Sequence, residues 1–342
     1  MNHRRVGLGI LAVVVIVLLA FVVAVLRMLT TYAAPPVDPA WAVEGARSVP
    51  EGAVSVRFTG TSTLLLSDGE TAWIVDGWFS RFGPLAMLGG EVAPDLEAIE
   101  RGLARNEVDR LAAVIPVHSH YDHAMDAPEV ARRTGALLIG SESTANIGRG
   151  WGLPEEQIRV VRGGERLRLG DFEVTLVATK HFQFADPELR ERALGSPRIE
   201  TPLEPPVGIF EYRVGQPFAL HVVHPRGRFL VQGSAGYEVG GLEGLEADVV
   251  FLGIGGLGTQ TEAYRERYWR ETVGRSGARR VVAIHWDSLM GPIEGPFTGE
   301  LRAASILAGG TEETRAFLES RLAAESDLRI ETLPRYAPVV VF

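Results

Sequence analysis

The stretch VHSHYDHAMD, residues 117–126, carries three of the eight histidines of the chain within six positions. Imidazole nitrogen is a strong ligand for zinc and related ions, and a His-x-His pair at the end of a strand can turn both rings toward one ion. His118 and His120 have this spacing. Asp122 and His123 add a carboxylate and a third imidazole for a neighbouring position, so one loop can serve two ions roughly 3.5–4 Å apart.

Two single histidines follow later predicted strands. His181 ends the segment FEVTLVATKH, and His285 stands near the end of RRVVAIHW. Either residue alone is more often a satisfied strand-end histidine, but an ion needs three or four ligands, which the first loop cannot supply unaided. We therefore predict both as ligands. His221 and His224 lack the strand-end pattern and are predicted to be surface or edge residues.

Composition restricts the chemistry of the chain. With 342 residues, 46% of them hydrophobic, it can bury a large core in one large domain or two small ones. The 43 acidic and 34 basic residues give a formal charge of −9, which argues against nucleic acid as a partner. Cysteine is absent, which excludes disulfides, thiolate ligands and a cysteine nucleophile. Any metal must therefore bind to imidazole and carboxylate groups.

The N-terminus contains an apolar run, VGLGILAVVVIVLLAFVVAVL, at residues 6–26. At 1.5 Å per residue it is long enough to cross a hydrocarbon core of roughly 30 Å. We predict an uncleaved signal anchor over residues 1–32. The alternative is a cleaved signal peptide, because residues 31–33 (TYA) loosely fit a cleavage site, although the apolar region of such peptides runs only about 7–15 residues.

Charges beside the apolar run predict its orientation. Arg4 and Arg5 precede it and only Arg27 closely follows it, which favours a cytoplasmic N-terminus and an extracytoplasmic domain at the cell membrane. Residues 33–50 are rich in proline and small residues and are predicted to be a linker. Residues 51–342 are then predicted to form the catalytic domain.

Hydrophobic periodicity predicts alternating strands and helices. Strands are expected within 54–80 with a turn at residues 67–69, and then at 110–117, 136–140, 158–164, 166–171, 172–181, 210–214, 218–224, 228–237 and 279–286. Helices are expected at 93–106, 129–135, 143–150, 262–275 and 311–325, with Asp126 as the N-cap of the second. Two sheets with helices outside them fit this order. The histidine cluster should lie on a strand-to-helix loop.

The string His118-x-His120-x-Asp122-His123, followed by single histidines at strand ends, resembles the metallo-β-lactamase-fold hydrolase superfamily. The segments HSHYDH, GSAGY and VVAIHWDSL are most similar to the branch that contains bacterial ascorbate-6-phosphate lactonases and N-acyl-phosphatidylethanolamine-hydrolysing phospholipase D. The resemblance covers roughly residues 54–290. It implies an α+β protein, a four-layer αββα sandwich with its site at one edge of the two sheets.

The resemblance also implies two sets of metal ligands, His118, His120 and His181 for the first ion and Asp122, His123 and His285 for the second. Asp76, in the segment WIVDGWF, resembles an aspartate that orients one of these ligands from behind, and its alternative interpretation is a turn residue after a strand.

One position departs from the family pattern. Most relatives have a GDTGY-like stretch whose aspartate bridges both ions, but this chain has Ser234 at that place. A neutral hydroxyl cannot replace an anionic bridge, so the second ion should bind more weakly. Glu238 and Asp287 are near in sequence and are candidates to compensate.

These residues predict a hydrolase. A bound ion, zinc or alternatively manganese, iron or nickel, in one or two copies, lowers the pKa of water from 15.7 toward about 7. Asp122 would orient the nucleophile and pass a proton to the leaving group of an ester, lactone or phosphodiester. Residues 182–206 mix phenylalanine with arginine and either cover a small-molecule or lipid-like substrate or form a solvated insertion.

Two other functions stay open at this stage. One is a membrane-anchored binding protein with a degenerate hydrolase fold, motivated by Ser234. The other is a true β-lactamase, which the later motifs disfavour. The oligomeric state does not follow from the sequence.

Overall fold

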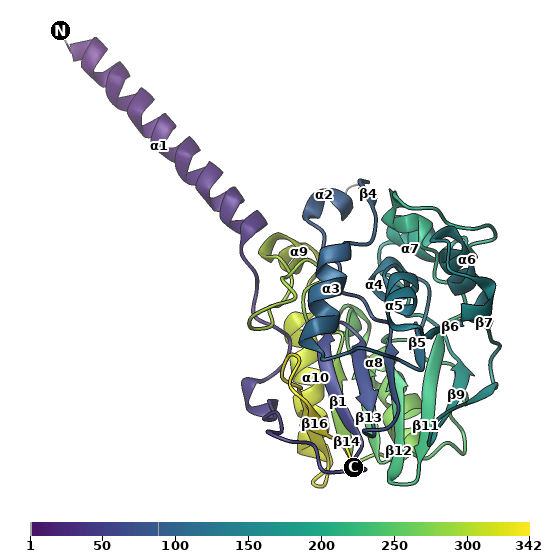
Figure 1. Cartoon of the computed structure of the whole chain (residues 1–342). Coiled ribbons are helices and arrows are strands. Elements are labelled where there is room, and N and C mark those ends of the chain that lie inside the picture. Colours follow the sequence, from purple (N-terminus) through teal and green to yellow (C-terminus); the bar gives the residue numbers. More distant parts are fainter. Residues whose placement is uncertain (1, 88) are drawn as a thin grey trace.

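Two seven-stranded sheets pack face to face at the centre of the molecule (Figure 1). The structure is a computed structural model that describes residues 2–87 and 89–342. The first sheet has the order β16 (Val339–Val340), β1 (Ser55–Gly60), β2 (Thr63–Ser67), β3 (Ala72–Val75), β5 (Ala113–Ile115), β6 (Leu137–Gly140) and β7 (Ile158–Val160). The second has the order β15 (Arg329–Glu331), β14 (Arg280–Ile284), β13 (Val249–Gly253), β12 (Gly227–Gln232), β11 (Phe218–His224), β9 (Phe172–Ala178) and β8 (Arg166–Leu169).

Each sheet has an antiparallel half and a parallel half. Strands β16, β1, β2 and β3 are antiparallel, whereas β3, β5, β6 and β7 are parallel. In the second sheet β8, β9, β11 and β12 are antiparallel and β12 to β15 are parallel. Strand β13, which the sequence analysis missed, lies inside the second sheet between β14 and β12 and is buried throughout. A strand buried on both faces has no alternation to reveal it.

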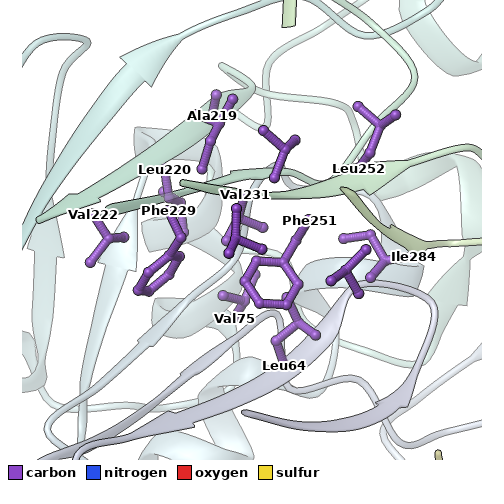
Figure 2. Packing of buried hydrophobic residues seen from close by; sticks show 14 of the residues in the cluster. Leu64, Val75, Ala219, Leu220, Val222, Phe229, Val231, Phe251, Leu252 and Ile284 are labelled. Atoms are coloured by element: carbon purple, nitrogen blue, oxygen red, sulfur yellow. The ribbon is translucent and has the colours of Figure 1, made fainter. Parts of the chain in front are cut away.

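The main core fills the space between the sheets. Figure 2 shows Phe229, Val231 and Phe251 of the second sheet facing Leu64 and Val75 of the first. All five side chains are fully buried. Burial of one such side chain contributes about 1.5–3 kcal/mol, so this layer holds the two sheets in a fixed relation.

Helices form the two outer layers. Helices α3 (Leu96–Arg105) and α5 (Ala127–Thr134) pack Ile99 and Val130 against the outer face of the first sheet, beside α6 (Glu142–Gly150). Helices α8 (Glu262–Trp269) and α10 (Thr311–Ala324) bury Tyr268 and Leu318 in the core cluster of the second sheet. The layers therefore follow the order αββα, as predicted.

Shorter elements complete the chain. They are the β10–β4 pair (Val207–Gly208 and Glu91–Val92), helices α2 (Pro84–Met87), α4 (Tyr121–Ala124), α7 (Pro187–Leu194) and α9 (Arg302–Ala308), the 3-10 turns Pro39–Trp41, Glu155–Gln157, Ile209–Glu211 and Leu257–Thr259, and the π-turn Arg270–Gly274.

The strand predicted at residues 210–214 is wrong. A 3-10 turn covers Ile209–Glu211, and the carbonyl oxygen of Val214 accepts a hydrogen bond from the backbone of Ser119. The segment therefore bonds to the histidine loop instead of a sheet, and this contact overrides the strand preference of its Phe210, Tyr212 and Val214.

Residues 33–50, expected as a linker, lie against the domain. Val37 is buried, and its carbonyl oxygen accepts a hydrogen bond of 2.9 Å from Arg315. The backbone of Ala46 donates to the carbonyl oxygen of Pro338 at 2.7 Å. The segment is thus held along its length. Its proline-rich composition suits an irregular segment that lies on the domain surface.

Helix α1 (Asn2–Thr30) projects from the domain (Figure 1). Its window Val13–Thr30 has a mean hydropathy of 2.9, and none of the window is buried. The helix is about 44 Å long at 1.5 Å per residue, which exceeds a hydrocarbon core. It is a candidate membrane span by length and composition.

Candidate metal centre

Chain direction explains why distant histidines meet. Strands β3 and β5 are parallel, and Asp76 and His118 follow their carboxyl ends. In the second sheet β9 runs in the same direction as β12 and β14, and His181 and His285 follow β9 and β14. Carboxyl ends of like-directed strands lie at one edge of a sheet. These side chains therefore gather at one edge of the sandwich.

The histidine cluster is only partly on a loop. Tyr121–Ala124 form the one-turn helix α4, so Asp122 and His123 are helical. Asp126 occupies the N-cap position of α5, but its side chain makes no cap bond because its backbone is already helical, with φ −84° and ψ −17°. Its carboxylate instead accepts backbone hydrogen bonds from Phe79 and Ser80 at 2.8 and 2.7 Å. The predicted capping role was wrong.

The first set of ligands consists of His118, His120 and His181. Their ring centroids lie 4.8–5.0 Å apart, with the planes at 76–80°. His120 Nε2 faces the carbonyl oxygen of Ala193 at 3.3 Å, and its Nδ1 lies 3.1 Å from His118 Nε2. His118 Nδ1 is buried without a hydrogen-bond partner among the described residues. The unsatisfied Nδ1 is on the other side of the ring from Nε2, whereas one nitrogen from each of the three rings lies within 4.8 Å of the others, which fits a bound cation.

The second set consists of Asp122, His123 and His285. Three distances are equal: His123 Nε2 to Asp122 Oδ2, His285 Nε2 to Asp122 Oδ2, and His285 Nε2 to His123 Nε2 are each 3.3 Å. Ligands 2.0–2.2 Å from a tetrahedral zinc ion lie about 3.3–3.6 Å from one another. The three atoms therefore have the separations that three ligands of one tetrahedral ion require.

Asp76 lies directly behind His123. Its Oδ2 is 2.8 Å from His123 Nδ1, and its Oδ1 accepts the backbone N–H of Val117 at 2.8 Å. Both carboxylate and imidazole are almost fully buried. The carboxylate holds the proton of His123 on Nδ1, which leaves Nε2 free to face the second set.

The edge of the sandwich stores backbone strain. Thr61, Asp76 and His285 have φ values of 54°, 60° and 56°, a left-handed conformation that is costly for residues with a side chain. Each such residue costs on the order of 1–3 kcal/mol and is usually found at functional sites. The backbone N–H of His285 donates to Thr61 at 2.5 Å, which fixes the imidazole at the end of β14.

The two sets differ in charge. Burial lowers the pKa of His118 and His181 well below the usual range and that of His120 to about 4, so the first set is neutral and its lone pairs are free. Burial also opposes protonation of His123, but the carboxylates of Asp122 and Asp76 outweigh it and raise the pKa of His123 to about 10. An ion at the second set must therefore displace a proton.

Ser234 lies in a tightly packed loop. Its hydroxyl oxygen is buried and has no hydrogen-bond partner among the described residues. A Cβ at Gly236 would overlap the carbonyl oxygen of Lys180, so this loop needs glycine to reach the segment before His181. Glu238 instead pairs with Lys180 at 2.9 Å, and Asp287 accepts the backbone N–H of Thr61 at 2.7 Å. Neither carboxylate is directed as a replacement for the lost aspartate.

His221 and His224 are buried residues of β11, so their prediction as surface or edge residues was wrong. His221 Nε2 contacts the carbonyl oxygen of Glu246 at 2.8 Å, and His224 Nε2 lies 3.4 Å from Asp68 Oδ2. Neither histidine belongs to the two ligand sets.

Glu300 escaped the sequence analysis. Ser288 Oγ donates to its Oε2 at 3.3 Å, and burial followed by the charge of Asp287 raises the pKa of Glu300 to about 7. It is 15 residues beyond His285 in a segment without regular periodicity, so no local pattern marks it. This carboxyl group is a further titratable group beside the site.

A hollow of about 280 Å³ lies beside α7, lined by Gly89, Arg192, Gly208, Phe210 and Arg213 among others. The guanidinium of Arg192 stacks over the ring of Phe210 at 4.0 Å. The next residue, Ala193, is the one whose carbonyl oxygen faces His120.

Comparisons with known proteins support the same fold. Residues 75–198 match the family model described as a beta-lactamase superfamily domain. Proteins named UPF0173 metal-dependent hydrolase from Anaeromyxobacter sp. (strain K) and Myxococcus xanthus are 29% and 27% identical, over 43% and 46% of this chain and 50% of each relative. The chain thus spans about half the length of the curated relatives it matches.

Among solved structures, Igni18, described as a novel metallo hydrolase from Ignicoccus hospitalis, is similar with 14% identity and a TM-score of 0.47, covering 84% of this chain and 98% of that one. The family match includes Asp76, the whole histidine loop and His181, and the second sheet brings His285, the remaining predicted ligand, to the same edge. The chain therefore has the metallo-β-lactamase fold.

Proposed function

We propose that the protein is a metal-dependent hydrolase that uses metal-activated water on an ester, lactone or phosphodiester. The observation that carries this proposal is the triangle of Asp122 Oδ2, His123 Nε2 and His285 Nε2, with every side 3.3 Å. Hydrogen bonding alone explains this triangle poorly, because two imidazole nitrogens that face one carboxylate oxygen have no reason to face each other as well.

The donor set suits zinc, with manganese, iron and nickel as alternatives, because it offers five imidazoles and one carboxylate. The first set would hold one ion, and Asp122, His123 and His285 would hold a second. When bound, a divalent cation supplies Lewis-acid polarisation and makes water acidic enough to act as a nucleophile near neutral pH.

Asp122 is the residue proposed to act in catalysis. Burial opposes its ionisation, but His123 and His285 hold the pKa of Asp122 well below its usual range. The carboxylate therefore stays ionised, and it can orient water for attack and take the proton that the leaving group later receives. Asp76 holds the proton of His123 on Nδ1, so His123 Nε2 keeps a fixed position beside Asp122.

The hollow beside α7 supports an amphiphilic substrate. Arg192 and Arg213 offer positive charge for an acidic group, and Phe210 and Ile209 offer apolar surface. Arg192 lines the hollow, and the carbonyl oxygen of the next residue, Ala193, faces His120, so a ligand in this hollow would contact the segment that touches the first set. A small molecule or lipid with an acidic group and an apolar part suits this lining, and lactonase-like or phospholipase-D-like chemistry is the finer expectation.

We also propose that α1 is an uncleaved single-pass anchor with a cytoplasmic N-terminus, so that the domain lies outside the cell membrane. The exposed apolar window Val13–Thr30 and the arginines at residues 4 and 5 support this topology. A cleaved signal peptide is the alternative. The intact mass of protein extracted from membranes distinguishes the two, because cleavage after Ala33 removes the whole helix.

Ser234 favours a second candidate function, a binding protein that keeps the fold without turnover. Its hydroxyl oxygen is buried and unpartnered, and a neutral group there leaves the repulsion of two cations uncompensated. This alternative predicts bound metal without hydrolysis of any substrate.

The decisive experiment uses the full chain in detergent. Elemental analysis gives the metal and the ions per chain, and hydrolysis is then measured on bis-p-nitrophenyl phosphate, p-nitrophenyl butyrate, a simple lactone and nitrocefin. Asp122→Asn should abolish turnover, whereas Asp109→Asn, an exposed change before β5 and outside every candidate metal group of the described residues, should not. Metal-loaded protein that hydrolyses none of these substrates, before or after Ser234→Asp, would favour the binding function. Hydrolysis of nitrocefin alone would favour a β-lactamase.

A further inference from the structure

The anchor helix is joined to the domain without a free linker. Immediately after α1, Tyr32 forms an antiparallel β-bridge with Leu301. The backbone of Ala33 donates to the carbonyl oxygen of Glu300 at 2.8 Å, and that of Arg302 donates to Thr31 at 2.9 Å. The Tyr32 hydroxyl also donates to the carbonyl oxygen of Met290 at 3.0 Å. The exit of the helix is thus held by the segment that follows His285.

This bridge lies close to the proposed membrane surface. The uncharged run ends at Leu26, and Thr31 is only about 8 Å further along the helix axis at 1.5 Å per residue. The headgroup layer of a bilayer is itself on the order of 5–8 Å thick on each side. The bridge should therefore lie at headgroup level.

Helix α9 follows the bridge directly and packs against α1. Its residue Ile306 is 68% exposed, one of the most exposed large apolar side chains among the described residues. Arg302 at its start and Arg27 in the last turn of α1 add positive charge at the same level. An apolar side chain with flanking arginines suits a surface that lies in the headgroup region of a phospholipid bilayer.

We propose that the face formed by α9 rests on the bilayer and that the Tyr32–Leu301 bridge holds the domain in this orientation. The inference rests on the proposed anchor but not on catalysis. Figure 1 shows α1 leaving the domain on the side where α2, β4, α7 and α9 lie. The hollow beside α7 would then lie on the membrane side of the domain, where an amphiphilic substrate with an acidic group can reach it without leaving the interface.

The absence of cysteine allows a direct test. Ile306→Cys in the full chain is labelled with an environment-sensitive fluorophore and reconstituted into vesicles of phosphatidylethanolamine and phosphatidylglycerol that contain a lipid with a nitroxide near its headgroup. The matched control is Asp171→Cys. Asp171 is exposed and lies just before β9, whereas His181 follows the other end of that strand, so the control label lies at the end away from the candidate site. The label at residue 306 should lose most of its fluorescence, and the label at residue 171 should keep it.

Equal fluorescence of the two labels would overturn the proposed orientation, and so would an intact mass that shows loss of α1. A second variant tests the bridge. A Gly/Ser insertion of about ten residues after Thr30 leaves the bridge intact but lets the domain move about 17 Å from the anchor. The insertion should restore fluorescence at residue 306, and persistent quenching would contradict the role of the bridge. Neither readout depends on metal or turnover, so a failure here is distinguishable from a failure of the hydrolase proposal.

Discussion

The change Asp76→Asn tests how the second ligand set is oriented. Asp76 Oδ2 accepts the Nδ1 proton of His123 at 2.8 Å, in a site from which water is almost fully excluded. Asparagine retains an oxygen for the backbone N–H of Val117, and it tolerates the φ of 60° better than most residues. Its amide nitrogen would face the His123 proton, donor against donor, and would favour the tautomer with the proton on Nε2, the atom that faces Asp122.

We expect the ion at the second set to bind 10–100-fold more weakly, which corresponds to about 1.4–2.7 kcal/mol. Competition with a chelator gives the dissociation constant, elemental analysis the ions per chain, and thermal unfolding the stability. The matched control is Glu129→Gln, because Glu129 is also a buried carboxylate but bonds to Arg132 and Trp151 and belongs to no candidate group of metal ligands among the described residues. It should leave metal binding unchanged. Two results would refute the assignment of His123 as a ligand oriented by Asp76. One is an equal dissociation constant in wild type and Asp76→Asn, and the other is a chain that binds one ion with or without this change.

Three further predictions follow from the same geometry. Ser234→Asp should raise the affinity for the second ion, which the number of ions per chain measures. It should also lower the melting temperature of the metal-free protein in calorimetry, because it buries a carboxylate without a partner. Burial raises the pKa of Asp126 from 3.8 to about 6. At 1.36 kcal/mol per pKa unit, ionisation of Asp126 above pH 6 lowers the free energy of unfolding by roughly 3 kcal/mol. Stability should therefore rise as pH falls through about 6, and a wild-type melting temperature that shifts with pH no more than that of Asp126→Asn would contradict this. Arg192→Ala should raise KM for acidic substrates with little change in kcat, whereas Arg190→Ala, whose guanidinium is bonded to the carbonyl oxygens of residues 184 and 185, should change neither.

Much of the fold was readable because its signals are local. The spacing His118-x-His120-x-Asp122-His123 needs only one loop and one helical turn to gather four donors, and the apolar length of α1 follows from composition alone. The strand between residues 249 and 253 was missed because burial on both faces removes the alternation that marks a half-exposed strand. The same reason hid the burial of His221 and His224.

By itself, the sequence determined the chemistry on offer: imidazole and carboxylate donors without thiols, an apolar N-terminal run, and a serine at residue 234, where the family resemblance implies an aspartate. The tertiary structure decided which donors lie together, because His181 and His285 reach the 118–123 loop only through the direction and order of strands in two sheets. It also decided that residues 33–50 lie on the domain, since their partners Arg315 and Pro338 come from the far end of the chain. Contacts across such separations depend on how whole sheets pack, and no local pattern encodes them.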